Sequence, residues 1–283
     1  METVALCNGI KMPLEGFGVF QVPDAAECER AVSDALACGY RLIDTAAAYF
    51  NEEAVGAAIR KSGIPREELF ITTKLWIQDQ GYENAKRAFQ TSLDKLGLDY
   101  LDLYLIHQPM NDYYGSWRAM EEMYEASKIR AIGVCNFYPD RLVDLCLNAR
   151  IAPMVNQVEL HPFFAQPEAL ASMEEFGVVP EAWGPLAEGN YDIFTHPVLM
   201  EIGKKYGKTA AQVALKWNTQ RGVVIIPKTT HRERMEENLN IWDFALNEED
   251  MAAIATLDLG RSEIINHFTA QTAKFLNGWK IHE

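Results

Sequence analysis

Eight short apolar segments, each followed by a stretch with helical spacing, recur along this chain of 283 residues. Apolar runs of this length are typical of buried strands. Their regular alternation with helices, without any linker-like or low-complexity segment, predicts one (β/α)₈ TIM barrel of the α/β class spanning residues 1–283. The strands are expected at residues 16–20, 41–43, 69–73, 101–106, 129–134, 154–158, 178–183 and 222–226.

Both ends of the chain add to this barrel. Residues 3–13 form two short apolar runs around Asn8-Gly9, a dipeptide suited to a type I′ hairpin turn, so a hairpin should plug one end. The tail from Gly260 is expected to be irregular and to cover the other end, where the active site of such a barrel lies. Helices are expected at 24–38, 52–61, 84–96, 116–126, 140–148, 167–176, 197–206, 209–220, 232–239 and 247–256.

Composition excludes several classes of function. A formal net charge of −14 argues against nucleic acid or an anionic membrane as a general partner, and no stretch is apolar for long enough to span a bilayer. The first residues lack the features of a signal peptide. The five cysteines are scattered without a Cys-x-x-Cys pair, and no residue cluster suggests a metal. We therefore expect a cytoplasmic protein with reduced thiols.

Four polar side chains follow the ends of three of these apolar runs. Asp44 and Tyr49 follow the run 41–43, Lys74 follows 69–73, and His107 follows 101–106. Parallel strands of a closed sheet end on the same side, so these residues should meet at one rim of the barrel. Each of them alone is more often a cap, a rim residue or a core group. Together at the strand ends they indicate a proton-transfer site.

The glycines before the first helix carry a weaker signal. The segment Gly16–Gln21 begins like a dinucleotide-binding loop, but Gln21 stands where the third glycine belongs. The following helix also begins too late, at Asp24, so a Rossmann domain is disfavoured.

Motifs at the strand ends give the chain a family resemblance along nearly its whole length. It resembles an aldo-keto reductase of the bacterial type that includes 2,5-diketo-D-gluconate reductases. The motifs are Gly16-Phe17-Gly18, Asp44-Thr45-Ala46-Ala47-Ala48-Tyr49, Thr73-Lys74-Leu75-Trp76, Leu103-Tyr104-Leu105-Ile106-His107, Gly133-Val134-Cys135-Asn136-Phe137, Asn156-Gln157-Val158-Glu159, Ala182-Trp183-Gly184-Pro185-Leu186 and Ile226-Pro227-Lys228. The resemblance implies that Asp44, Tyr49, Lys74 and His107 form a catalytic tetrad.

This chemistry explains the residue types. Hydride transfer to a carbonyl produces an alkoxide, which must be protonated as it forms. Tyr49 would be the general acid, with its pKa lowered by the ammonium of Lys74. Asp44 would orient Lys74, and His107 would donate a hydrogen bond to the carbonyl oxygen. The expected reaction is reduction of aldehydes or ketones to alcohols with NADPH.

The resemblance also implies a cofactor site. Trp183 would stack on the nicotinamide, and Asn136 and Gln157 would bind its carboxamide. The basic, hydroxyl-rich segment 228–234 follows the last strand and opens a helix, which favours phosphate binding and hence NADPH over NADH. Arg232 is expected to be solvated. The expected cofactor-binding residues are Gly18, Val19, Asp44, Asn136, Gln157, Trp183, Gly184, Leu186, Lys228, Thr229, Thr230, Arg234, Glu237 and Asn238.

The substrate is less defined. Phe20, Trp76, His107 and Gln108 are expected to line its pocket together with the tail aromatics. Many members of the resembled family have tryptophan at the positions of Phe20 and Gln108, and serine where this chain has Cys135. Small aldehydes, dicarbonyls or keto-sugars such as 2,5-diketo-D-gluconate fit such a pocket. Cys135 is either a redox-sensitive thiol or, more commonly for a buried cysteine, inert.

Two alternatives use the same barrel. A Schiff-base aldolase would use Lys74 or Lys228 as its nucleophile. A regulatory subunit would bind the cofactor without turnover. The expected partner is in either case a small molecule, and the protein is expected to be a monomer.

Overall fold

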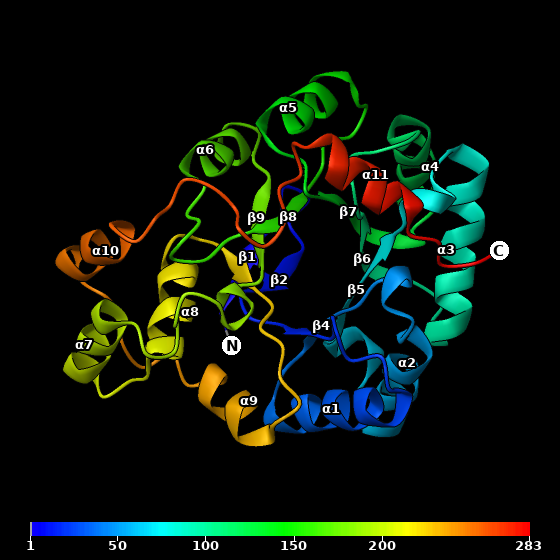
Figure 1. Ribbon diagram of the computed structural model, residues 1–283. Helices are drawn as coiled ribbons and strands as arrows, with labels where there is room; N and C mark the ends of the chain where they lie inside the picture. Colours follow the sequence, from blue (N-terminus) through cyan, green and yellow to red (C-terminus); the bar gives the residue numbers. More distant parts are fainter. Residues whose placement is uncertain (1) are drawn as a thin grey trace.

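The computed structural model describes residues 2–283, and eight of its strands form one sheet in which every neighbouring pair is parallel (Figure 1). The strands lie in chain order, each where the sequence places an apolar run. They are β3 (Phe17–Gly18), β4 (Leu42–Asp44), β5 (Phe70–Leu75), β6 (Leu101–Ile106), β7 (Ile129–Cys135), β8 (Val155–Glu159), β9 (Val179–Trp183) and β10 (Val224–Ile225).

The sheet closes between its first and last strands. Glu15 and Ile225 form a parallel bridge, and the backbone N–H of Gly16 donates to Ile225 O at 2.8 Å. A Cβ atom on Gly18 would lie 2.8 Å from Ile226 O, so the seam requires a residue without a side chain there. The predicted (β/α)₈ barrel is confirmed.

Helices surround the sheet, and each of its eight strands is followed by at least one helix (Figure 1). Asp24 caps the first helix by accepting a hydrogen bond from Glu27 N at 2.8 Å. None of the helices within residues 2–283 is long and apolar enough to cross a membrane. The helices are α1 (Ala25–Cys38), α2 (Glu52–Ser62), α3 (Tyr82–Leu96), α4 (Tyr113–Glu125), α5 (Pro139–Asn148), α6 (Pro167–Glu175), α7 (Pro197–Tyr206), α8 (Ala210–Gln220), α9 (Arg232–Leu239), α10 (Glu248–Ala255) and α11 (Ala270–Gly278).

The N-terminal hairpin pairs β1 (Thr3–Ala5) with β2 (Lys11–Pro13). Its turn is not the predicted type I′, which needs positive φ at both central residues. Pairing closes at Leu6 and Ile10, which leaves a three-residue loop in which Gly9, with φ of 83°, is the only left-handed residue. The hairpin lies at the N-terminal ends of the strands, since Asn8 Nδ2 donates to Arg130 O near the start of β7.

The sequence predicts an irregular C-terminal tail, and this prediction is wrong in part, because the tail contains the helix α11. Thr269 caps this helix, and Leu276 buries itself against Trp76 and Ile77 beyond the end of β5. The indole N–H of Trp76 donates to Trp279 O at 2.9 Å. These contacts join residues that are distant in the sequence and meet only when the chain folds. They hold the tail across the C-terminal ends of the strands, as predicted.

A buried carboxylate joins three strands at the opposite end of the barrel. Asp102 in β6 is fully buried, forms ion pairs of 2.6 Å with Arg66 and Arg130, and accepts from Ile71 N at 2.9 Å. Removing it leaves a buried N–H without a partner and two cations without their anion. We expect Asp102→Ala to lower the free energy of unfolding by about 3 kcal/mol.

Urea unfolding measures this change. Glu201→Ala is the matched control, since it removes an exposed acid whose ion pair with Lys204 should contribute little. Equal stability of the two variants would contradict the structural role of Asp102.

Candidate active site

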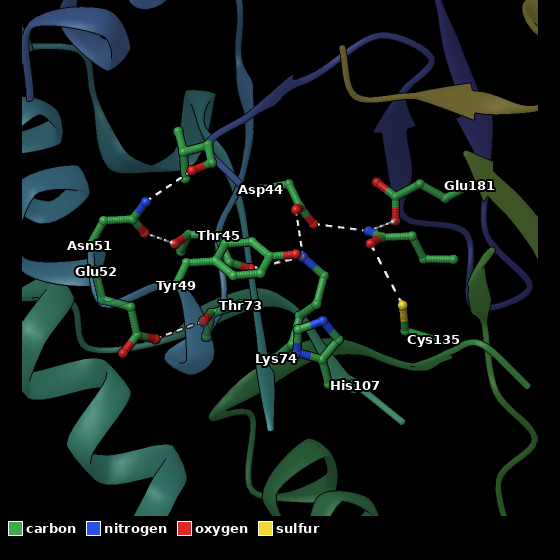
Figure 2. Close-up of polar contacts among 12 residues, drawn as sticks. Asp44, Thr45, Tyr49, Asn51, Glu52, Thr73, Lys74, His107, Cys135 and Glu181 are labelled. Atoms are coloured by element: carbon green, nitrogen blue, oxygen red, sulfur yellow. Dashed lines mark hydrogen bonds and ion pairs between the residues drawn. The ribbon is translucent and has the colours of Figure 1, made fainter. Parts of the chain in front are cut away.

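Three neighbouring strands bring the predicted catalytic side chains together (Figure 2). Asp44 ends β4, Lys74 lies near the end of β5, and His107 follows β6. Tyr49 lies beyond Asp44 in a single 3₁₀ turn, Ala47–Tyr49, which directs the chain back over the barrel mouth. The parallel register places these ends at one rim, as predicted.

The loop that carries Tyr49 is fixed by buried polar contacts. Thr45 Oγ1 donates to Asn51 Oδ1 at 2.7 Å, and Asn51 Nδ2 donates to the backbone oxygens of Val19 and Val22 at 3.0 and 3.2 Å. These bonds tie the loop after β4 to the loop after β3. Tyr49 is therefore held by the same barrel ends that hold Asp44.

Lys74 is the centre of the site. Its ammonium group donates to Asp44 Oδ1 at 2.5 Å, to Thr45 O at 2.9 Å and to Tyr49 Oη at 3.3 Å. An ammonium group has three N–H donors, so all of them are in use. Because Tyr49 Oη accepts from Lys74, its own proton is free to be donated elsewhere.

The charges of this group follow from burial. Burial opposes the charge on Lys74, but Asp44 more than offsets it and raises the pKa of the lysine. Burial also raises the pKa of Tyr49, and Lys74 lowers it without reversing the shift. The ammonium of Lys74 lowers the pKa of Tyr49, as the sequence predicts, but burial has the larger effect, so the net shift in the protein is upward. Tyr49 thus keeps its proton at neutral pH.

His107 is a neutral imidazole. Burial lowers its pKa well below the usual range, and the charge of Lys74 lowers it further. The ring meets the edges of Tyr49 and Trp76, with ring centroids 5.6 and 5.1 Å away. A neutral histidine can donate one hydrogen bond to a carbonyl oxygen without adding a positive charge.

Asp44, Tyr49 and His107 line one cavity of about 600 Å³ at the C-terminal ends of the strands. Lys74 lies behind Tyr49 and does not reach the cavity surface. The predicted residues that line it are Gly18, Phe20, Asp44, Tyr49, Trp76, His107, Gln108, Asn136, Gln157, Trp183, Gly184, Leu186 and Lys228. The predicted cofactor residues outside its lining are Val19, Thr229, Thr230, Arg234, Glu237 and Asn238.

The predicted nicotinamide residues lie side by side. Trp183 ends β9 half-buried, and its indole N–H donates to Asn136 Oδ1 at 2.8 Å, which fixes the plane of the ring. Asn136 Nδ2 donates to His107 O at 3.1 Å. The arrangement offers a flat aromatic face next to the predicted catalytic side chains.

The basic segment continues from the cavity wall onto α9. Lys228 and Arg234 are exposed, and neither forms an ion pair within residues 2–283. Arg232, in contrast, pairs with Asp34 and Glu236. Thr229, Thr230, Glu237 and Asn238 lie on the same segment, where Thr229 and Asn238 are buried.

Comparison with known proteins identifies the family. Residues 14–259 match the profile of the Aldo/keto reductase family. The chain belongs to this family. It is thus an oxidoreductase, and the predicted family membership is confirmed.

Relatives of this aldo/keto reductase are similar along nearly their whole length. The chain is 50% identical over 258 residues to a glyoxal reductase of Bacillus subtilis (strain 168), covering 91% of this chain and 93% of the relative. It is 44% identical over 261 residues to methylglyoxal reductase DkgA of Yersinia pestis, covering 91% and 93%. A Bombyx mori aldo-keto reductase, solved in complex with NADP, shares 33% identity with a TM-score of 0.88, covering 94% and 95%.

Sequence reasoning missed part of the site of this aldo/keto reductase. Phe194 also lines the cavity, and among the tail aromatics Phe275 and Trp279 do so whereas Phe268 packs on Tyr138 instead. Glu181, a buried acid beside Asp44 and Gln157, was missed as well. The only sign of Glu181 in the sequence was that a carboxylate lies within the otherwise apolar run 178–183.

Proposed function

We propose that this aldo/keto reductase reduces the carbonyl group of small aldehydes, dicarbonyls or keto-sugars to an alcohol with NADPH, and that Tyr49 is the general acid. The observation that carries the proposal is the bonding of Lys74. Its three donors end on Asp44, Thr45 and Tyr49, which leaves the phenolic proton of Tyr49 directed to the cavity.

The residues divide the work as follows. When bound, NADPH supplies the hydride that adds to the carbonyl carbon. His107 donates a hydrogen bond to the carbonyl oxygen and holds it beside Tyr49. Tyr49 gives its proton to that oxygen as negative charge develops, and Lys74 stabilises the phenolate that remains. The carbonyl gains one hydride and one proton and becomes an alcohol.

The cavity residues fit the cofactor. Trp183 provides a rigid aromatic face, and Asn136 beside it accepts from the indole N–H at 2.8 Å. Lys228 and Arg234 are cations without anionic partners within the described residues, which suits a phosphate group next to a helix N-terminus. We therefore assign nicotinamide binding to Trp183 and Asn136, and phosphate binding to Lys228 and Arg234.

The relatives narrow the substrate class. Two of them are named for glyoxal and methylglyoxal, which are small dicarbonyls. The test is a panel of these compounds, simple aldehydes and 2,5-diketo-D-gluconate, scored by loss of reduced-nicotinamide absorbance. We expect turnover of at least the dicarbonyls. Tight NADPH binding without turnover of any member would favour a regulatory subunit instead.

A Schiff-base aldolase is the less favoured alternative. A lysine nucleophile needs a free electron pair, whereas Lys74 is paired with Asp44 and its pKa is raised. Borohydride trapping of a substrate imine would reverse this preference.

Preference for NADPH over NADH is tested at Arg234. A charge-assisted hydrogen bond to phosphate is worth about 1.5–3 kcal/mol, so Arg234→Ala should raise the KM for NADPH by about ten- to hundredfold. The KM for NADH should not change. Arg232→Ala is the matched control, because Arg232 is already paired with Asp34 and Glu236. A similar KM for NADPH in both variants would remove the phosphate assignment.

A further inference from the structure

Glu181 is a buried acid that the proposed reaction does not use. It lies in the middle of β9, fully buried, on the side of Asp44 that faces away from Tyr49 (Figure 2). Its Oε2 accepts a hydrogen bond from Gln157 Nε2 at 3.0 Å. Its Oε1 has no partner within residues 2–283. A buried carboxyl with one hydrogen bond and no ion pair within the described residues is costly, so it needs an explanation.

Gln157 connects this acid to the catalytic group. Its Nε2 also donates to Asp44 Oδ2 at 2.9 Å. An amide nitrogen has two hydrogens, so the two acids use both of them. The Gln157 amide is thereby oriented, with its nitrogen between the acids and its oxygen on the other side, 3.7 Å from Cys135 Sγ. Gln157 itself lines the cavity.

We propose that Glu181 is a positioning residue, which together with Asp44 holds the amide nitrogen of Gln157 so that its oxygen accepts from the carboxamide of the bound nicotinamide. This inference rests on the proposed function. Without Glu181, one amide hydrogen of Gln157 loses its partner, and the amide can turn its nitrogen toward the cavity. It would then present a donor to the carboxamide where an acceptor is needed.

Glu181 also links the site to pH. Its pKa is raised to about 8, mainly by burial and then by the charge of Asp44, although the hydrogen bond from Gln157 and the charge of Lys74 lower it. Cys135 is the other titratable group that interacts with it. Above this pH a second carboxylate stands beside Asp44. The added negative potential favours the proton on Tyr49, which slows proton donation. Reduction should therefore slow above about pH 8.

Two substitutions at Glu181 distinguish its hydrogen bond with Gln157 from its ionisation. Glu181→Gln can keep an acceptor for Gln157 Nε2 but cannot ionise, whereas Glu181→Leu removes both functions. Glu15→Gln is the matched control, since Glu15 is equally buried with a pKa also raised to about 8, but it bonds to Tyr40 and Trp242. The measurements are the dissociation constant of NADPH by fluorescence, and kcat and KM from pH 6 to 10.

The expected pattern is specific. Glu181→Leu should weaken NADPH binding by about three- to tenfold, the value of one hydrogen bond, with a smaller change in kcat. Glu181→Gln should restore the affinity and should lose the decline in rate near pH 8. Glu15→Gln should match the wild type in both measurements.

The outcomes distinguish the inference from the proposed function. Unchanged NADPH affinity in Glu181→Leu, or the same kinetic changes in Glu15→Gln, would overturn the role of Glu181. A wild-type protein that reduces no carbonyl would overturn the proposed function alone. In that case weaker NADPH binding by Glu181→Leu and its recovery in Glu181→Gln would still support the orientation of Gln157.

Discussion

Replacing Tyr49 by phenylalanine should lower kcat for carbonyl reduction by about 10²- to 10⁴-fold, the usual contribution of a general acid. The substitution removes only the hydroxyl group that accepts from Lys74 at 3.3 Å. The ring keeps its contacts with Phe20 and His107. The loss should therefore fall on the proton transfer, with little change in stability.

Steady-state kinetics and NADPH binding together measure this effect. The dissociation constant of NADPH should remain near the wild-type value, because the hydroxyl is assigned to the carbonyl and not to the cofactor. Tyr114→Phe is the control, since it removes a hydroxyl that bonds to Asp144 outside the cavity. A Tyr49→Phe variant with more than a tenth of wild-type kcat would contradict the assignment.

Replacing Glu15 by glutamine should stabilise the protein at high pH and leave it unchanged at low pH. Burial raises the pKa of Glu15 from 4.5 to about 8. Between these values the folded state holds a proton that the unfolded state has lost, so wild-type stability falls as pH rises and is lowest above pH 8. A shift of this size corresponds to about 5 kcal/mol, which the glutamine avoids.

The structure indicates that glutamine fits this position. Glu15 Oε1 accepts from Tyr40 at 3.3 Å, and Oε2 accepts from Trp242 at 3.2 Å. The single hydroxyl hydrogen of Tyr40 can be donated to Met235 O at 3.2 Å instead, and the hydroxyl oxygen can then accept from an amide at position 15. Urea unfolding at pH 4 and pH 9 compares the variant with the wild type. An equal stability difference at both pH values would show that Glu15 does not titrate with folding.

The meeting of the proposed catalytic residues at one rim was predictable because it depends on topology. Apolar runs define the strands, and parallel strands in a closed sheet bring their ends to one side. Asp44, Lys74 and His107 each follow such a run, so their meeting required no knowledge of side-chain packing. The fold could be predicted for the same reason, whereas the family was indicated by the motifs at the strand ends.

Features that depend on packing could not be predicted. The tail helix α11 gains its stability from Leu276 against Trp76 and Ile77, which are distant in sequence. The pKa of Tyr49 depends on burial that the sequence does not reveal. The type of the hairpin turn depends on which residues form the last hydrogen-bonded pair of the two strands. The dipeptide Asn8-Gly9 alone did not define that pair.

Transfer of deuterium from the cofactor tests the central claim most directly. NADPH carrying two deuterium atoms at C4 of the dihydronicotinamide is mixed with glyoxal or methylglyoxal, and the product is analysed by mass spectrometry. We predict an alcohol with one deuterium on the former carbonyl carbon, formed by the wild type and at least about 10²-fold more slowly by Tyr49→Phe. Unlabelled product, or labelled product formed equally fast by both proteins, would contradict hydride transfer at the cavity that Tyr49 and His107 line.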